Sequence, residues 1–129
     1  MSQIGQVTIH SLSLKNSDRF QLCELSQSDN TMLLEIGAGV VEDLCIHHYQ
    51  TNRILAVTGR LVMVVLQNKQ YDYISLGVNS PDILTIPSGI PYGFFNLGST
   101  PCWAINDVVY HVPEHKMSLH EPGYCSLKP

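Results

Sequence analysis

The chain has 129 residues, 44% of them hydrophobic, and its 7 Lys and Arg against 11 Asp and Glu give a net charge of −4 at pH 7. This length predicts one domain with a sizeable core, and the few, scattered basic residues exclude the positively charged surface of a nucleic-acid-binding protein. Because the sequence has neither about 18 consecutive apolar residues nor a basic, apolar leader, we expect a cytoplasmic protein that has no membrane partner.

Short runs rich in Val, Ile, Leu and Tyr alternate with turn residues along the whole chain, a pattern typical of an all-β barrel or sandwich. The expected strands are residues 7–14, 20–25, 32–36, 43–49, 54–57, 61–66, 71–76, 83–86, 92–97 and 102–109. Residues 61–66 show little polar alternation, so we expect that strand to be buried on both faces. Residues 67–70 are expected to form a hairpin loop. About ten short strands with short connections predict a jelly roll whose paired sheets enclose one ligand-binding mouth.

The four cysteines are far apart in the sequence and form no C-x-x-C pair; they are Cys23, Cys45, Cys102 and Cys125. The chain is neither very short nor rich in cysteine, which are the usual marks of a disulfide-stabilised secreted domain. We therefore expect reduced, partly buried thiols.

One segment combines a tight turn with a sequence motif. It runs from Pro87 through Gly89 and Tyr92 to Asn96. Pro87 presets φ and Gly89 permits a positive φ, so the chain can reverse direction between two strands. The spacing P-x-G-x-x-(H/Y)-x-x-x-N resembles the second motif of the cupins, in whose metal-binding members the position of Tyr92 is a histidine ligand. The resemblance implies a double-stranded β-helix (jelly-roll) barrel.

We expect residues 1–129 to form a single cupin domain, with a motif-bearing core at 31–113 and an irregular tail at 114–129.

The first cupin motif, G-x5-H-x-H-x3,4-E-x6-G, is only partly matched. With Gly59 as its last glycine, Asn52 takes the place of the carboxylate, His47 that of the second histidine and Cys45 that of the first. With Tyr92 in the last place, this donor set suits a first-row metal poorly. We therefore expect no metal ion and no other cofactor. In a strand, residues two apart share a face, so His47 and His48 would point to opposite faces; this parity does not decide which one points inward.

A closer resemblance rests on three segments: His48-Tyr49-Gln50, residues 86–94 and residues 107–115. They resemble landmarks of the dTDP-4-dehydrorhamnose 3,5-epimerase family, and residues 71–86 resemble the related nucleotide-sugar 3,4-ketoisomerases. The resemblance spans residues 43–115, more than half of the chain. It implies metal-independent isomerase chemistry on a nucleotide-activated keto-deoxy sugar: a histidine removes a proton beside the ketone and a tyrosine returns one. The near-neutral pKa of histidine suits a general base in this role.

Carried over residue by residue, the resemblance makes Tyr110 the candidate acid. The base is His48 by literal match or His47 by cupin spacing, and both remain candidates, with a slight preference for His47. The implied substrate-binding residues are Tyr49, Gln50, Arg53, Arg60, Tyr92, Phe94 and Asn106. The implied partners are a sugar or nucleotide-sugar ligand and a second copy of the chain, with residues 7–14 as the edge strand of a homodimer.

Departures from the epimerase pattern keep another reading open. Cys45 stands where the pattern has an arginine and Asn52 where it has a lysine, and the carboxylate that polarises the base has no counterpart. Cations are the groups that hold a diphosphate. The alternative is therefore a catalytically silent cupin that binds a small carbohydrate or serves as an accessory subunit. Metal-dependent dioxygenase or isomerase chemistry is a third, less favoured reading.

Overall fold

The computed structural model describes residues 5–11, 14–16, 21–23, 28–77 and 82–111, and in these ranges it is built of β-strands and loops. The strands are β1 (Thr8–Ser11), β2 (Leu14–Asn16), β3 (Gln21–Cys23), β4 (Asn30–Ile36), β5 (Val41–Cys45), β6 (Gln50–Thr58), β7 (Arg60–Gln67), β8 (Gln70–Gly77), β9 (Asp82–Ile86), β10 (Tyr92–Phe95) and β11 (Cys102–Tyr110). The all-β prediction is confirmed. Within the same ranges no helix has the length and apolar character that crossing a membrane requires.

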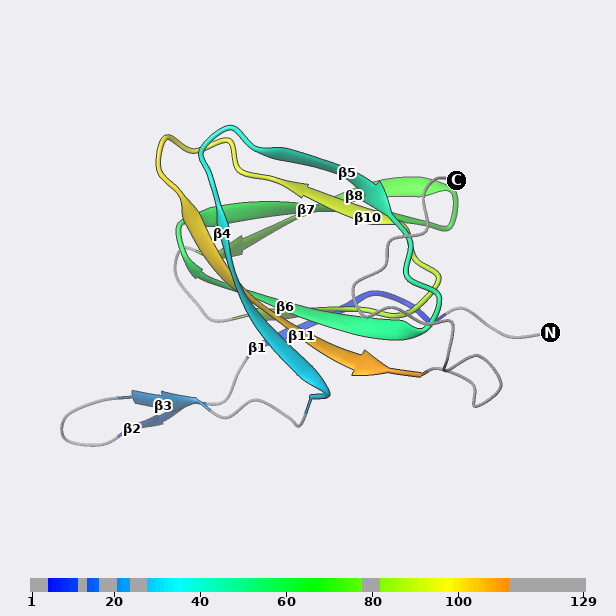
Figure 1. Cartoon of the computed structure of the whole chain (residues 1–129), viewed down its shortest axis with the longest axis horizontal. Coiled ribbons are helices and arrows are strands. Elements are labelled where there is room, and N and C mark those ends of the chain that lie inside the picture. The colour runs from blue at the N-terminus through cyan, green and yellow to red at the C-terminus, as the bar shows by residue number, and fades with distance from the viewer. Residues whose placement is uncertain (1–4, 12–13, 17–20, 24–27, 78–81, 112–129) are drawn as a thin grey trace.

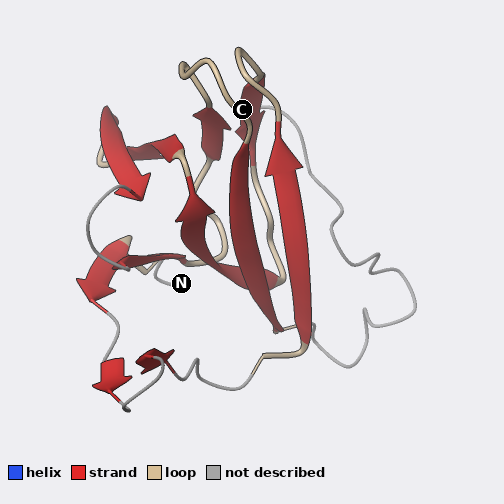
Figure 2. Ribbon diagram, turned by 90° about the vertical axis from the view of Figure 1, so that its left-hand side faces the viewer, coloured by secondary structure: helices blue, strands red, loops and turns tan. Residues whose placement is uncertain are grey.

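Two antiparallel sheets face each other and enclose the core (Figure 1). The five-stranded sheet has the order β1-β9-β6-β11-β4, and the four-stranded sheet has the order β5-β10-β7-β8. The hairpin of β2 and β3 forms a separate two-stranded ladder, which lies to one side of the two layers in Figure 1. Figure 2 shows the same layers after a quarter turn. The chain passes from the five-stranded to the four-stranded sheet at Gly59, whose φ of 78° favours glycine.

The core lies between the sheets and follows the two-residue period of the strands. In β7, Leu61, Met63 and Val65 are at most 1% exposed, and the side chains between them are partly buried on the outer face. The prediction that this strand is buried on both faces is therefore correct only for its inner face. The apolar core consists of Ile36, Ile54, Ala56, Leu61, Met63, Val65, Leu76, Leu84, Ile86, Ile90, Tyr92, Cys102 and Ala104.

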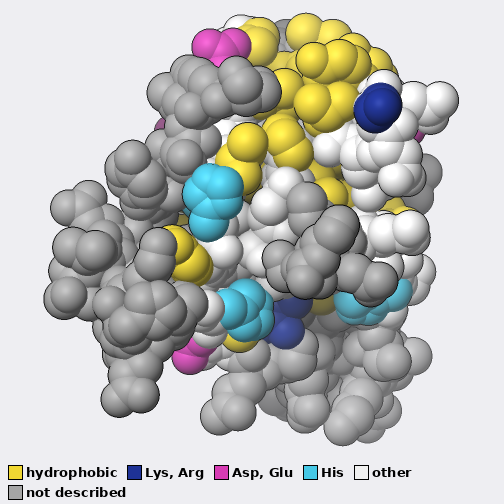
Figure 3. All heavy atoms as spheres, turned by 90° about the vertical axis from the view of Figure 1, so that its right-hand side faces the viewer, with side chains coloured by type: hydrophobic (Ala, Val, Ile, Leu, Met, Phe, Trp, Pro, Cys, Tyr) yellow, Lys and Arg dark blue, Asp and Glu magenta, His cyan; other side chains and the backbone are white. Residues whose placement is uncertain are grey.

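The outer face of the four-stranded sheet is also rich in apolar side chains. Val41, Tyr71 and Tyr73 are 64%, 56% and 67% exposed. Hydrophobic side chains gather at the top of the molecule in Figure 3, over the layer that this sheet forms in Figure 1. This exposed apolar surface explains why 61–66 looks uniformly apolar in the sequence.

The strand boundaries around His47 differ from the prediction. We expected residues 43–49 to form one strand, but β5 ends at Cys45, residues 48 and 49 form a bend, and β6 begins at Gln50. The reason is the pairing of the neighbours: β5 follows β10 as far as Tyr92, which is opposite Cys45, and β6 pairs with β11 from Gln50 onward. His47 therefore lies at the crossing from one sheet to the other.

The predicted hairpin loop at 67–70 is confirmed as a two-residue turn. Gln67 is paired with Gln70, and both intervening residues have positive φ, 53° at Asn68 and 61° at Lys69. Two consecutive positive φ values are those of a type I′ turn, in which asparagine followed by glycine is preferred. Asn68 fits this preference and Lys69 does not.

The turn motif 87–96 joins β9 to β10 as predicted, and Asn96 fixes its far end. Asn96 is 1% exposed, and its Nδ2 donates to the carbonyl oxygens of Ile36 at 3.0 Å and Thr100 at 2.9 Å. Its Oδ1 accepts a hydrogen bond from the Gly98 amide at 2.9 Å. The asparagine that ends the cupin motif thus has a structural role here: it ties β4, β10 and the loop before β11 together.

The prediction of reduced thiols holds for Cys102, which is free and buried. It is wrong for Cys45, which is part of a disulfide. Residues 112–129, with the predicted tail at 114–129, lie outside the described residues.

Gly93, in the motif, offers a test of the fold. A Cβ added to Gly93 would lie 2.5 Å from the carbonyl oxygen of Glu42 on β5. We expect Gly93→Ala to lower the free energy of unfolding by about 2–3 kcal/mol, because the β5–β10 pairing must open to admit the methyl group. The measurement is urea denaturation followed by circular dichroism.

Gly37→Ala is the matched control, since its Cβ would meet only a side-chain carbon of Val40 at 3.5 Å, an ordinary contact. Equal stability of the two variants would contradict the close approach of β5 to Gly93.

Candidate functional site

The interior of the barrel is polar at one end. Gln50 and Asn52 at the start of β6 point inward with Ile54, and Asn106 does so from the neighbouring β11. Their exposed fractions are 2%, 1% and 9%. Burying an uncharged polar group costs free energy unless the group is hydrogen-bonded. The hydrogen bonds among these three side chains therefore show which polar atoms are left to bind a ligand.

The three amides form a ladder, which we call the amide ladder (Gln50, Asn52 and Asn106). Gln50 Nε2 donates to Asn52 Oδ1 at 3.0 Å, and Asn52 Nδ2 donates to Asn106 Oδ1 at 3.0 Å. Gln50 Oε1 is buried, and among the described residues it has no hydrogen-bond partner. A buried acceptor with an open lone pair is suited to a ligand hydroxyl or N–H group.

A histidine–tyrosine pair lies at the same end. His47 Nε2 is 3.1 Å from the Tyr92 hydroxyl, and both side chains are 8% exposed. The rings lie 5.6 Å apart at 42°. The backbone fixes both residues, because the Gly89 amide donates to the His47 carbonyl oxygen at 2.8 Å and Tyr92 is paired with Val65 of β7.

The sulfur of Cys45 lies 3.7 Å from the same nitrogen of His47. Since Cys45 is part of a disulfide, this sulfur is at most a weak acceptor. The imidazole therefore has a phenol and a sulfur beside its Nε2.

Burial raises the pKa of the Tyr92 phenol well above its ordinary value. The hydroxyl consequently stays protonated at any pH near neutrality. A neutral phenol can donate to a neutral imidazole or accept from a protonated one, so this contact is compatible with both states of His47.

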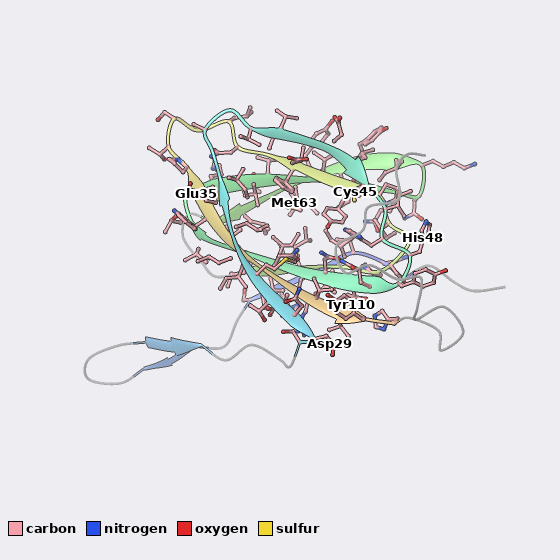
Figure 4. The ribbon with its side chains drawn as sticks, in the orientation of Figure 1. Asp29, Glu35, Cys45, His48, Met63 and Tyr110 are labelled. Atoms are coloured by element: carbon pink, nitrogen blue, oxygen red, sulfur yellow. The ribbon has the colours of Figure 1, made fainter. Side chains whose placement is uncertain are left out.

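Tyr110 lies on the inner face at the end of β11, directly opposite Gln50. Asn30 Nδ2 lies 3.5 Å from the Tyr110 hydroxyl, at the long limit for a hydrogen bond. The backbone amide of Tyr110 donates to Asp29 Oδ2 at 2.8 Å. Figure 4 shows Tyr110 and Cys45 toward the same end of the barrel and Glu35 at the other. The structure thus brings Tyr110 to the end that holds the amide ladder and His47.

His48 lies elsewhere. Its side chain is exposed and makes an edge-on ring contact with Tyr49 at 6.3 Å. Tyr49 is partly buried, and its carbonyl oxygen accepts a hydrogen bond from the His111 amide at 2.7 Å. Of the two candidate bases, His47 is the buried one.

Of the remaining predicted residues, Phe94 lies near the site, whereas Arg53 and Arg60 lie away from it. Phe94 packs against the core two residues beyond Tyr92. Arg53 is on the outer face of β6, with Nη2 3.9 Å from Asp107 Oδ2, and its side chain is 14% exposed. Arg60 is exposed at the start of β7, about 26 Å along β6 from the amide ladder. The structure does not bring either arginine to the polar end of the interior.

Asn52 also belongs to the candidate site, although it is not among the substrate-binding residues predicted from the sequence. The sequence contained the information needed to find Asn52. It is two residues from Gln50 and two from Ile54, so it shares their face once the strand is extended back to residue 50. In the part of the chain that the structure describes, no group of three or more His, Cys, Asp or Glu side chains is arranged to hold a metal ion.

Comparison with known proteins gives a fold and no sequence family: no family model matches the chain, and no curated protein does. Solved structures do match it. A dTDP sugar isomerase from Desulfovibrio desulfuricans is 18% identical at a TM-score of 0.73, covering 98% of this chain and 85% of that one. A TDP-quinovose 3,4-ketoisomerase from Campylobacter jejuni is 14% identical at a TM-score of 0.73, covering 86% and 90%.

A dTDP-6-deoxy-D-glucose-3,5-epimerase from Legionella pneumophila, solved with dTDP-4-keto-L-rhamnose, is 15% identical at a TM-score of 0.69, covering 88% and 72%. The fold is a cupin barrel. It is the fold implied by the turn motif of residues 87–96, and the resemblance to the sugar epimerases and ketoisomerases is confirmed at the level of this fold.

The buried phenol predicts a pH dependence of stability. Because the pKa of Tyr92 is raised by folding, its contribution is intact below the ordinary tyrosine pKa of about 10 and is lost as the pH rises above it. We expect the free energy of unfolding to fall above pH 10 with a slope approaching about 1.4 kcal/mol per pH unit from this group. Tyr92→Phe should remove that slope, as measured by denaturation between pH 8 and 11.5.

Tyr73→Phe removes the same hydroxyl from a side chain that is 67% exposed, and it controls for the loss of a hydroxyl as such. If Tyr92→Phe keeps the wild-type alkaline slope, the phenol ionises freely and the burial argument fails.

Proposed function

We propose that this cupin is a metal-independent isomerase or epimerase that acts on a nucleotide-activated keto-deoxy sugar by proton transfer between histidine and tyrosine. The observation that supports it most is the buried His47, held beside Tyr92 at the end of the barrel that Tyr110 also faces. Similar solved structures include a dTDP sugar isomerase, a 3,4-ketoisomerase and a 3,5-epimerase. These structures share the fold of this chain, and the reaction is what we propose in addition.

In the proposed reaction the imidazole of His47 takes a proton from the carbon beside the ketone. The C–H electron pair moves into an enolate whose charge is on the former ketone oxygen. Tyr110 then returns a proton to the same carbon from the opposite face in an epimerisation. In a ketoisomerisation Tyr110 protonates the former ketone carbon instead, and the proton of the neighbouring hydroxyl passes to the former ketone oxygen, so that the carbon that lost its proton becomes the new ketone. Tyr92 orients the imidazole by accepting a hydrogen bond from Nε2–H, which leaves the lone pair of Nδ1 for the proton from carbon.

The amide ladder has the role of orienting the sugar. Gln50 Oε1 is a buried acceptor that a ligand hydroxyl can satisfy, and Asn52 and Asn106 hold the Gln50 side chain in place. Such an acceptor favours a hydroxylated ring over an apolar one, because an apolar ligand would leave it unpaired.

One observation favours the alternative, a catalytically silent cupin that binds a small carbohydrate or serves as an accessory subunit. The inner end of the barrel presents amides where the epimerase resemblance implies a cation, since Asn52 occupies the place of a lysine and Arg53 lies near Asp107 on the outer face. Amides bind hydroxyl groups well without stabilising an enolate as a cation would.

Solvent deuterium uptake tests the enzyme. Incubated in D2O with a dTDP-4-keto-6-deoxyhexose, the protein should incorporate deuterium beside the ketone, as measured by proton NMR. His47→Asn and Tyr110→Phe should each lower the rate by about 100-fold or more, because each removes one proton-transfer group. His48→Asn is the matched control, since its exposed ring lies outside the barrel, and it should keep the wild-type rate.

Absence of uptake by folded wild-type protein over hours would remove the enzymatic proposal and leave the carbohydrate-binding one. Equal losses in His47→Asn and His48→Asn would contradict the assignment of the base to His47. Tyr110→Phe should keep its affinity for the ligand whether the protein is an enzyme or only binds carbohydrate. Binding and turnover are therefore measured on the same sample.

We further propose that the protein is a cytoplasmic homodimer that pairs through the N-terminal edge strand. In the five-stranded sheet β1 is at the edge, and all four of its side chains are exposed. An exposed edge strand presents unpaired backbone groups that a second copy can bind. Light scattering at micromolar concentration should give twice the chain mass of 14.4 kDa. A monomeric mass would overturn this proposal.

A further inference from the structure

A groove of about 380 Å³ lies beside the barrel end that holds His47. Its lining comes from the N-terminal segment, the tip of the β7–β8 hairpin and the turn before β10: Gly5, Gln6, Leu66, Gln67, Asn68, Lys69, Gly89, Ile90 and Pro91. We propose that this groove binds the diphosphate of the nucleotide-linked ligand, with the Lys69 ammonium group as its cationic contact. The inference rests on the proposed function and names the subsite that function requires.

The contacts between the groove walls show that it is a built feature of the fold. The Val7 amide donates to Gln67 Oε1 at 3.2 Å, which ties the N-terminal segment to the hairpin tip. A Cβ on Gly5 would come 3.1 Å from the Pro87 ring, so this segment also lies against the turn. Gly89, in the opposite wall, is bonded to the His47 carbonyl oxygen, which places the groove next to the interior site.

The distribution of cations favours this groove. Residues 28–77 and 82–111, which contain the barrel, carry three Lys or Arg residues: Arg53, Arg60 and Lys69. Arg53 lies close to Asp107 on the outer face, and Arg60 is at the opposite end of β7. Lys69 alone of these three lies at the His47 end, and a diphosphate needs a cation or several strong donors to leave water.

The reach of Lys69 fits a ligand whose sugar is in the barrel. Val65 is opposite Tyr92, and Lys69 follows four residues later on the same hairpin, about 13 Å along the strand. An extended lysine side chain shortens the distance between Lys69 and the Tyr92 level of the barrel. A sugar ring with its diphosphate is long enough to span the distance that is left. The nearest carboxylate on the hairpin, Asp72, accepts a hydrogen bond from Gln67 Nε2 at 3.4 Å and is absent from the groove lining.

The backbone at Lys69 gives an independent reason. Its φ of 61° occupies the turn position that prefers glycine, and its side chain is exposed, so no packing compensates the strain. A residue that breaks a local rule without a structural gain is a candidate for function. An ammonium group displayed at the rim of a groove supplies that function.

Isothermal titration with dTDP, with inorganic diphosphate and with thymidine tests the proposal. Lys69→Met keeps the length of the side chain and removes its charge, and it should weaken dTDP binding about 10-fold or more while leaving thymidine binding unchanged. Arg60→Met is the matched control and should bind dTDP as the wild type does. Lys69→Gly should lose the same affinity while its melting temperature rises, because glycine relieves the turn.

Equal dTDP affinity in wild type and Lys69→Met, each shown to be folded by its melting transition, would overturn the inference. So would an equal loss in Arg60→Met, or failure of the wild type to bind dTDP at all. The proposed function fails separately, through the absence of deuterium uptake. Uptake that persists at saturating substrate in Lys69→Met, with a raised KM, would support a binding role for the lysine and leave the chemistry to His47.

Discussion

The site depends on the pairing of β6 with β11. This pairing sets Gln50 opposite Tyr110 and turns Gln50, Asn52 and Asn106 toward the interior, where each amide can be satisfied by the next. A shift of β6 by one residue in this register would turn Gln50 and Asn52 outward, away from Asn106, and would bury the outward side chains of β6 instead. The apolar inner residues further along β6, such as Ile54, fix the register by being buried themselves. Hydrophobic packing at one end of the barrel thus holds a polar arrangement at the other.

The crossing between the sheets has a second role. Because β5 ends at Cys45 and β6 begins at Gln50, the intervening bend is free to turn His47 inward and His48 outward. The bend is held by the Gly89 amide, which belongs to the same turn that leads to Tyr92. One turn motif therefore positions both members of the histidine–tyrosine pair, although they are 45 residues apart in the sequence.

Local chemistry made the fold and the turn readable from the sequence. Pro87 and Gly89 specify a reversal whatever surrounds them, and a two-residue period predicts a strand wherever the core lies. The choice between His47 and His48 was not readable, because it depends on where β5 stops pairing with β10. The outward orientation of Arg53 was readable in principle, since it follows from its spacing to Ile54. The disulfide at Cys45 was not, because sequence spacing does not reveal which thiols meet in space.

The amide ladder has a direction. Gln50 donates to the oxygen of Asn52 and Asn52 donates to the oxygen of Asn106, so the acceptor left over at the Gln50 end has no partner in the described part of the chain. Rotating all three carboxamides by half a turn would preserve every internal bond with donor and acceptor exchanged, and would present a donor at that end instead. A guest offering a carbonyl and one offering a hydroxyl proton could thus be received by the same three side chains, at the cost of a concerted reversal.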